Sequence, residues 1–204
     1  MASLNLDGIV LAGGAGRRIG GGKAQYALSG RTLSERAIET LTRVCRQVVV
    51  AGRMGVSLPQ NLRCPIVFDA PETAGPVAGI AAGLAALTAD DVLVIACDLP
   101  LAGPALRHLA RMPAGSAAMA VGSVAPQPLC ARFPRVPALA VARQMLDGPT
   151  PSAMAFIDAL DADQILVPDA WLTNINTIGE AAVLERALAG NGVGTGHRWS
   201  RGPV

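Results

Sequence analysis

The sequence predicts an α/β fold with a mostly parallel central sheet and helices on both of its faces. Short runs rich in Val, Ile and Leu alternate with longer segments whose apolar residues have helical spacing, and this alternation is typical of parallel βαβ units. The composition agrees, because 51% of the 204 residues are hydrophobic and only 3% are aromatic. The core must therefore be built from Ala, Val, Leu and Ile.

Four apolar runs in the first half of the chain predict buried strands: Gly8–Ala12, Gln47–Ala51, Pro65–Phe68 and Asp91–Cys97. Leu33–Cys45 has apolar residues at helical spacing and follows Thr32. Because Glu35 stands three residues after Thr32, we expect a capping box at this helix start. Gly75–Leu87 is rich in small residues and predicts a helix that packs closely on the sheet.

The second half of the chain is less regular. It predicts strands at 117–121, 129–133 and 164–167, and helices at 136–145, 152–160 and 179–189. Residues 190–204 contain five glycines and no periodic pattern, so we expect a mobile tail there. With no internal repeat and no linker in sight, we expect residues 1–189 to form a single domain.

Charge and hydropathy exclude several classes of protein. A net charge of +2 is too small for binding nucleic acid through a basic face. Two uncharged stretches, Thr73–Ala89 and Met112–Ala131, are unsuited to a bilayer because the first is short and the second contains three prolines. The N-terminus lacks the pattern of a secretory signal. We therefore expect a cytoplasmic protein with no nucleic-acid or membrane partner.

The cysteines do not indicate a metal site. Cys45, Cys64, Cys97 and Cys130 are widely scattered, with no C-x-x-C pair and no histidine at a spacing typical of zinc ligands. We expect them to be buried, reduced thiols.

The loop after the first predicted strand, Leu11–Lys23, carries the strongest functional signal. Its glycines let the backbone approach a ligand closely, and Arg17, Arg18 and Lys23 stand among them. Exposed backbone N–H groups form a concave anion site, which cationic side chains can close. A flexible linker is the alternative, but a linker seldom follows a buried strand or carries clustered basic residues. The pattern favours a phosphate-binding loop.

Two common phosphate-binding motifs do not fit this loop. A Walker A motif needs glycine where Arg17 stands and Ser or Thr where Ala24 stands. The dinucleotide motif G-x-G-x-x-G fails because Ile19 occupies the place of its third glycine.

Two carboxylates follow predicted strands directly. In open parallel sheets, ligands bind beyond the carboxyl ends of the strands, and Asp69 and Asp98 stand there. Asp98 is suited to Mg²⁺, which takes few protein ligands and completes its shell with phosphate oxygens and water. The alternative for Asp98 is a helix cap or turn before Pro100, and Asp69-Ala70-Pro71 also makes an ordinary turn.

Five segments in order resemble the NTP-transferase-like nucleotidyltransferases, which activate sugar and cofactor phosphates with an NTP. They read LAGGAGRRIGGGK at 11–23, GPVAGI at 75–80, CDLP at 97–100, PLCA at 128–131 and NINT at 174–177. Within these enzymes the chain is most similar to the molybdenum cofactor guanylyltransferases, for which N-x-N-T is characteristic. The resemblance covers most of residues 7 to 187 and implies a three-layer, Rossmann-like nucleotidyltransferase fold.

The resemblance also implies an activity and a set of residue roles. The reaction would be transfer of GMP from GTP to molybdopterin, with Mg²⁺ as cofactor and pyrophosphate as the leaving group. The nucleotide and its phosphates would contact the first loop and one carboxylate, through Leu11, Ala12, Gly13, Gly14, Gly16, Arg18, Lys23 and Asp69. Asp98 would hold Mg²⁺, and Asn174 and Asn176 would contact the acceptor. Lys23, Arg18 and Asp98 would carry catalysis.

Four positions depart from the usual pattern of the family. Gly22 replaces an aspartate before the lysine, Ala51 replaces a polar residue at the end of the second strand, and Gln127 replaces a histidine. The acidic residue that usually follows N-x-N-T-P is displaced to Glu180. These departures affect the choice of base and acceptor more than the phosphate and metal sites.

Several alternatives remain open at this point. The chain could transfer CMP or UMP to a pterin, sugar or polyol phosphate, or it could bind nucleotides without turnover. A flavodoxin-like redox protein is disfavoured by the basic loop. We expect a monomer or weak homo-oligomer. A protein that delivers the cofactor, or a molybdoenzyme chaperone, remains open as a partner.

Overall fold

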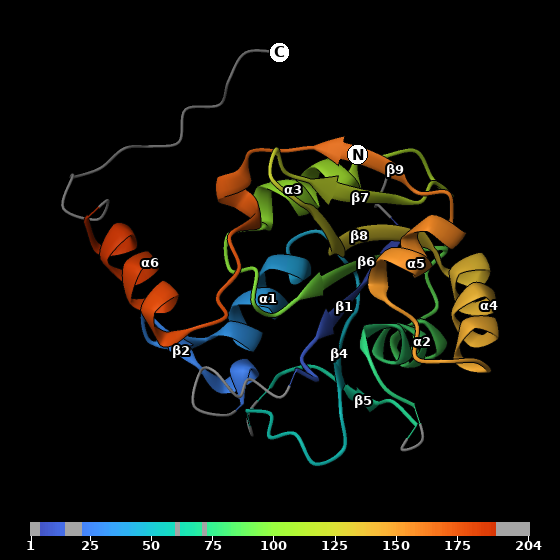
Figure 1. Ribbon diagram of the computed structural model, residues 1–204, viewed down its shortest axis with the longest axis horizontal. Helices are drawn as coiled ribbons and strands as arrows, with labels where there is room; N and C mark the ends of the chain where they lie inside the picture. The colour runs from blue at the N-terminus through green and yellow to red at the C-terminus, as the bar shows by residue number, and fades with distance from the viewer. Residues whose placement is uncertain (1–4, 15–21, 60–61, 71–72, 191–204) are drawn as a thin grey trace.

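A sheet of seven strands forms the middle layer of the protein in the computed structural model, which describes residues 5–14, 22–59, 62–70 and 73–190. Its strands lie in the order β5-β4-β1-β6-β8-β7-β9 (Figure 1). Their bounds are β1 Leu6–Leu11, β4 Val48–Gly52, β5 Ile66–Phe68, β6 Asp91–Ala96, β7 Ala118–Val121, β8 Pro126–Pro134 and β9 Asp163–Leu166.

The sheet is mostly parallel, as predicted. β5, β4, β1 and β6 run parallel to one another, and β9 runs parallel to β7. β8 is antiparallel to both of its neighbours, β6 and β7. Among the described strands of this sheet, β8 alone therefore runs in the opposite direction.

Helices cover both faces of the sheet (Figure 1). α2 (Pro76–Ala86), α4 (Arg135–Leu146) and α5 (Ala153–Ala159) pack on one face, and α1 (Leu33–Thr42) and α3 (Gly103–Ala110) pack on the other. α6 (Ile178–Gly190) stands apart from the sheet, beside β2, and adds Ala181 and Leu184 to the core under α1. The strands supply both cores by alternation, since Ile9 and Leu11 join the core under α2 while Val10 joins the core under α1. The three-layer architecture is confirmed.

Glycines let the layers approach closely at the central strand. A Cβ atom on Gly8 of β1 would lie 2.9 Å from Cδ1 of Leu41 in α1. On the other face, a Cβ atom on Gly83 of α2 would lie 2.6 Å from Cδ1 of Ile9. Real Cβ atoms do not approach so closely, so α1 and α2 reach β1 only because these residues lack side chains. The close packing predicted for the small-residue helix is confirmed.

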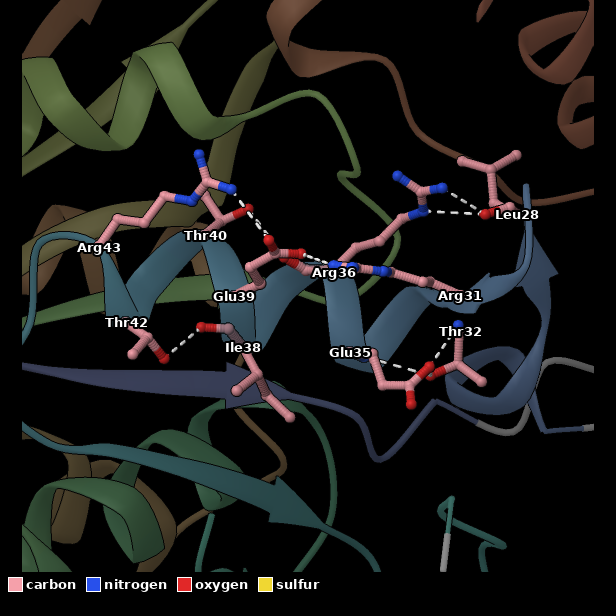
Figure 2. A network of polar contacts seen from close by, with 10 residues as sticks. All are labelled: Leu28, Arg31, Thr32, Glu35, Arg36, Ile38, Glu39, Thr40, Thr42 and Arg43. Carbon is pink, nitrogen blue, oxygen red and sulfur yellow. Dashed lines mark hydrogen bonds and ion pairs between the residues drawn. The ribbon is translucent and has the colours of Figure 1, made fainter. Parts of the chain in front are cut away.

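Helix α1 begins as the sequence predicts (Figure 2). The Thr32 hydroxyl accepts a hydrogen bond from the Glu35 backbone N–H at 3.2 Å, and the Glu35 carboxylate accepts from the Thr32 backbone N–H at 2.7 Å. These two bonds satisfy N–H groups that have no partner inside the helix. On the exposed side of α1, Glu39 pairs with both Arg31 and Arg43.

Three expectations need correction. The second long strand, β4, begins at Val48 and not at Gln47. Only Cys97 and Cys130 are buried, while Cys45 and Cys64 are half-buried at the edges of the core. Helix α3 and the short hairpin of β2 (Ala27–Leu28) and β3 (Arg31–Thr32) were not predicted.

Two further expectations concern the ends of the chain and membranes. The predicted mobile tail lies, beyond Gly190, outside the described residues. Within the described ranges, no helix is both long and apolar enough to cross a membrane.

Candidate active site

A cleft of about 650 Å³ opens beyond the carboxyl ends of β1, β4 and β6. It falls within the range of small-molecule sites, and it lies where open parallel sheets bind their ligands. Residues predicted to act from three separate parts of the sequence line it: Gly13, Gly14, Lys23, Asp69 and Asp98. The cleft therefore unites most of the predicted nucleotide and metal site.

The central strand carries the first loop into this cleft. Pairing continues past the ends of the strands, because Ala12 donates to the Ala51 carbonyl at 2.9 Å and Cys97 donates to the Leu11 carbonyl at 3.1 Å. Ala12 is 1% exposed, and the chain then becomes accessible at Gly13 and Gly14. The strands thus fix where the glycines begin. The predicted Gly16 and Arg18 lie outside the described residues.

Lys23 stands at the start of a short 3-10 helix, Lys23–Gln25. The preceding residue, Gly22, has φ +63°, a left-handed conformation that glycine adopts without strain. The buried Ala24 anchors the turn and leaves Lys23 facing the cleft. The glycine at position 22 is therefore compatible with the local backbone, although relatives usually carry aspartate there.

The ammonium group of Lys23 joins two distant segments. Its Nζ lies 2.5 Å from Oδ2 of Asp98 and 2.7 Å from Oδ1 of Asn176. The side chains of Lys23 and Asp98 are only 14% and 19% exposed, so that water screens this ion pair less than an ion pair on the surface. The backbone adds a further link, because Ile175 donates to the Asp98 carbonyl at 2.9 Å.

Asp98 has an unused oxygen. Its Oδ1 is buried and has no hydrogen-bond partner among the described residues, whereas buried carboxylate oxygens usually have one. A cation beside the ion pair would complete the coordination of this oxygen. The described residues hold no cluster of three or more His, Cys, Asp or Glu side chains. The chemistry of the site therefore suits Mg²⁺, which needs few protein ligands, better than a transition metal.

Cys97 also lines the cleft, next to Asp98. Burial, reinforced by the charge of Asp98, raises the pKa of the Cys97 thiol to about 12. The thiol is therefore neutral at physiological pH and unsuited to act as a nucleophile.

The opposite wall of the cleft carries one predicted and one unpredicted charge. Asp69 is 8% exposed, follows β5 directly and lines the cleft. Arg53 follows β4 and also lines the cleft, and a Cβ on Gly13 would lie 3.4 Å from Cβ of Arg53. Sequence reasoning missed Arg53, although its place just beyond a buried strand was a usable signal. No ion pair joins Arg53 to a carboxylate in the described ranges.

The two predicted asparagines in the segment before α6, Asn174 and Asn176, differ in their contacts. Asn176 contacts Lys23, whereas the half-buried Asn174 makes no side-chain hydrogen bond within the described part of the chain. Neither asparagine is among the residues that line the cleft. Glu180, the displaced acidic residue, forms hydrogen bonds at the start of α6. It accepts from the backbone N–H of Thr177 at 2.9 Å, and its own N–H donates to the Thr177 hydroxyl at 3.2 Å. The two residues form a second capping box.

An open α/β sheet with a glycine loop, a lysine and a carboxylate at one edge is the arrangement of a nucleotide-binding enzyme. Residues 8–167 match the model of the MobA-like NTP transferase domain. The chain belongs to this family, and it is a nucleotidyltransferase. The family and the fold expected from the sequence are both confirmed.

Similar proteins extend over nearly the whole chain. It is 32% identical to a "probable molybdenum cofactor guanylyltransferase" of Mycobacterium avium, with 92% of this chain and 98% of that protein covered. The solved structure of molybdopterin-guanine dinucleotide biosynthesis protein A from Archaeoglobus fulgidus has a TM-score of 0.67 at 21% identity, covering 90% of this chain and 99% of that chain. An inositol-1-phosphate CTP transferase from T. maritima reaches 0.69 at 12% identity, covering 94% and 98%. These two structures share the fold.

Proposed function

We propose that this nucleotidyltransferase transfers GMP from GTP to the terminal phosphate of molybdopterin in a Mg²⁺-dependent reaction. The observation that carries the proposal is the Lys23–Asp98 pair at the cleft, with an unpartnered carboxylate oxygen beside it. An ammonium that binds phosphate next to a carboxylate that binds metal suits phosphoryl chemistry. The choice of guanine and molybdopterin follows the name of the Mycobacterium avium relative.

The reaction needs charge neutralisation more than acid–base catalysis. An oxygen of the acceptor phosphate attacks the α-phosphorus of GTP, the bond from that phosphorus to the bridging oxygen of the β-phosphate breaks, and pyrophosphate leaves. Because the acceptor is already anionic at neutral pH, no general base is required. Positioning and electrostatic stabilisation then supply the rate enhancement.

The residues divide this work between them. The backbone of Gly13 and Gly14 would present N–H groups to the phosphates, and Lys23 would bind a phosphate oxygen directly. Asp98 would hold Mg²⁺, which supplies positive charge to the phosphate oxygens when bound. The predicted roles of Gly16 and Arg18 in phosphate binding belong to the same proposal.

The nucleotide would bind in the cleft, and the acceptor would bind beside Lys23, where the segment before α6 reaches it. Leu11, Ala12, Gly13 and Asp69 would contact the nucleotide; Leu11, Gly13 and Asp69 line the cleft near the ends of β1 and β5, whereas Ala12 is buried behind them. Asn174 and Asn176 would contact the acceptor from the segment before α6. A delivery protein or molybdoenzyme chaperone, and the cytoplasmic location, stay predictions.

The test is thermal unfolding with GTP, CTP, UTP and ATP, each with and without Mg²⁺. A ligand that binds only the native state adds about 2.7 kcal/mol of stability at a hundredfold excess over its Kd. We expect a stabilisation that is selective for GTP and larger with Mg²⁺. A shift selective for CTP or UTP would contradict the choice of guanine. No shift with any nucleotide would contradict the proposed activity as a whole.

A further inference from the structure

Lys23 is the only lysine in a chain whose lysines and arginines together number 17. An ammonium group differs from a guanidinium group, because it offers three donors in a tetrahedral arrangement rather than a planar fork. Two of the three serve Asp98 and Asn176, at 2.5 and 2.7 Å. One donor is then left for a ligand in the cleft, and its direction is set once the other two are fixed.

The position of Asn176 is determined by its backbone. The preceding residue, Ile175, is 0% exposed and donates its N–H to the Asp98 carbonyl at 2.9 Å. The N–H of Asn176 itself donates to Oε2 of Glu180 at 2.6 Å. These two bonds hold the backbone on the N-terminal side of the Asn176 Cα, and the N–H of Thr177, which donates to Oε2 of Glu180 at 2.9 Å, holds it on the other side. The side-chain oxygen of Asn176 is thereby held against Lys23.

The bond from Asn176 to Glu180 goes beyond what helix capping requires. A capping box needs the carboxylate to accept only from the N-cap residue, which is Thr177 in α6. Glu180 accepts a second N–H, that of Asn176, and this is the shorter of the two bonds. In α1 the backbone N–H of Thr32, the N-cap itself, is the one backbone donor to the Glu35 carboxylate within the described residues.

We propose that Glu180 is a positioning residue, which acts on Lys23 through Asn176 and so aims the remaining donor of the ammonium at the nucleotide phosphates. The inference rests on the proposed role of Lys23 as a phosphate ligand. The chain of contacts runs from Glu180 Oε2 to the Asn176 backbone, and from Asn176 Oδ1 to Lys23 Nζ. Glu180 is exposed and lies outside the residues that line the cleft, so it acts without touching substrate.

Glu180 is ionised under ordinary conditions. The backbone N–H of Asn176 is the largest of the causes that hold the pKa of Glu180 below its usual value, and Thr177 and the charge of Lys23 lower it further. A carboxylate accepts a stronger hydrogen bond than a neutral group does. The anchor is therefore fully formed at neutral pH.

The uniqueness of Lys23 permits a direct test. Protein labelled with ¹⁵N-lysine gives a single side-chain ammonium signal in NMR, whose exchange with water reports the hydrogen bonds of Lys23. We expect Glu180→Ala to exchange about tenfold faster than the wild type. Glu180→Gln, which keeps an oxygen acceptor, should restore the slow exchange. Glu185→Ala is the matched control, because it removes another contact of α6, to the Ser29 N–H, and leaves Asn176 untouched.

Kinetics provide the second readout. We expect Glu180→Ala to lower kcat/KM for the nucleotide about tenfold and Glu185→Ala to leave it unchanged. Residues that act through one another are not additive, so Glu180→Ala should have no further effect in an Asn176→Ala background. Should Glu180→Ala fail to fold, Asn176→Ala keeps the capping box intact and must show the same fast exchange.

The outcomes separate this inference from the proposed function. Slow exchange in the wild type, lost in Glu180→Ala and recovered in Glu180→Gln, would support it even if the choice of nucleotide were wrong. The inference would be overturned by unchanged exchange in Glu180→Ala, by an equal loss in Glu185→Ala, or by fast exchange in the wild type. Additive kinetic effects of Glu180→Ala and Asn176→Ala would also overturn it.

Discussion

Helices α1 and α6 begin with the same sequence pattern, yet the two capping boxes differ in what they hold. Thr32 and Glu35 exchange hydrogen bonds at 3.2 and 2.7 Å, and Thr177 and Glu180 exchange them at 3.2 and 2.9 Å. The residue before each N-cap differs. In α1 it is Arg31, which pairs with Glu39 on the surface (Figure 2). In α6 the residue before the N-cap is Asn176, which contacts the lysine of the cleft.

The two capping boxes have similar geometry, so the difference between them comes from the residue before the N-cap and from what that residue contacts. The side chains of Arg31 and Glu39 are 59% and 43% exposed, and ion pairs at such positions contribute about 0–1 kcal/mol. Lys23 and its partner Asp98 are 14% and 19% exposed, and they line the cleft. The α1 box therefore adds stability alone, while the α6 box also sets the geometry of the site.

The largest expected effect on activity comes from a substitution in the active site, at Asp98. We expect Asp98→Asn to lower the Mg²⁺-dependent kcat at least about 100-fold, because the substitution removes the charge that would hold the metal and the partner of Lys23. The measurement is steady-state pyrophosphate release across a Mg²⁺ titration. A variant that folds normally and turns over at the wild-type rate would contradict the metal assignment.

Substitution of Lys23 should have the next largest effect on activity, after substitution of Asp98. We expect Lys23→Ala to lose about 2 kcal/mol of transition-state stabilisation, the scale of one electrostatic contact in an active site. Lys23→Arg should restore little of it, because a planar guanidinium does not reproduce the tetrahedral donors. The matched control is Arg31→Ala in β3, just before α1, for which kcat/KM should stay at the wild-type value. An unchanged kcat/KM in Lys23→Ala would remove Lys23 from the mechanism.

Substitution of Arg53 tests how the cleft binds the nucleotide. We expect Arg53→Ala to weaken binding of the nucleotide about tenfold, the scale of one charge-assisted hydrogen bond. The cause would be loss of a cation that lines the cleft. Titration calorimetry measures the change, with Arg43→Ala at the exposed C-cap of α1 as the control. Unchanged affinity in Arg53→Ala would show that Arg53 does not contact the phosphates of the bound nucleotide.

Matched substitutions of the two N-cap threonines, Thr32 and Thr177, test the two capping boxes directly. Thr32→Ala and Thr177→Ala should each destabilise the protein by about 1 kcal/mol, the usual cost of removing an N-cap side chain. Only Thr177→Ala should also lower kcat/KM, because it loosens the turn that holds Asn176. Urea unfolding and pyrophosphate release on the same preparations check both statements. Equal activity in the two variants would break the distinction drawn between α1 and α6.

The smallest effect is a dependence of stability on pH that the two boxes share. The backbone N–H of Thr32 lowers the pKa of Glu35, and that of Asn176 lowers the pKa of Glu180. A carboxyl group whose pKa is depressed on folding stabilises the protein above its unfolded pKa, and this stability is lost as the pH falls through the folded pKa. Glu35→Gln and Glu180→Gln should therefore flatten the decline of Tm below pH 4.5. A decline as steep as that of the wild type would contradict both shifts.

Much of the fold could be predicted because its signals are local. Short runs of Val, Ile and Leu indicated β1, β4 and β6, and Thr32 with Glu35 marked the start of α1. The direction of β8 was not predictable, since alternation of side chains is the same in parallel and antiparallel strands. Helix α3 begins with Gly103 and Pro104, residues that indicate a break in most contexts but are compatible with a first turn.

The site was predictable only where strand ends bring residues together. Asp98 and the first loop follow adjacent parallel strands, so their proximity follows from the topology. The contact between Lys23 and Asn176 joins residues 153 positions apart, and no local pattern encodes it. Glu180 could be predicted as a helix cap, but its second bond depends on that long-range contact.

The proposed reaction is transfer of GMP from GTP to molybdopterin in the cleft. The most direct measurement is pyrophosphate release by the purified protein with Mg²⁺ and each of GTP, CTP and UTP, with and without molybdopterin. We predict release that requires both GTP and molybdopterin and is stoichiometric with the dinucleotide product. Release with CTP or UTP in place of GTP, or no release under any combination, would contradict the proposed reaction.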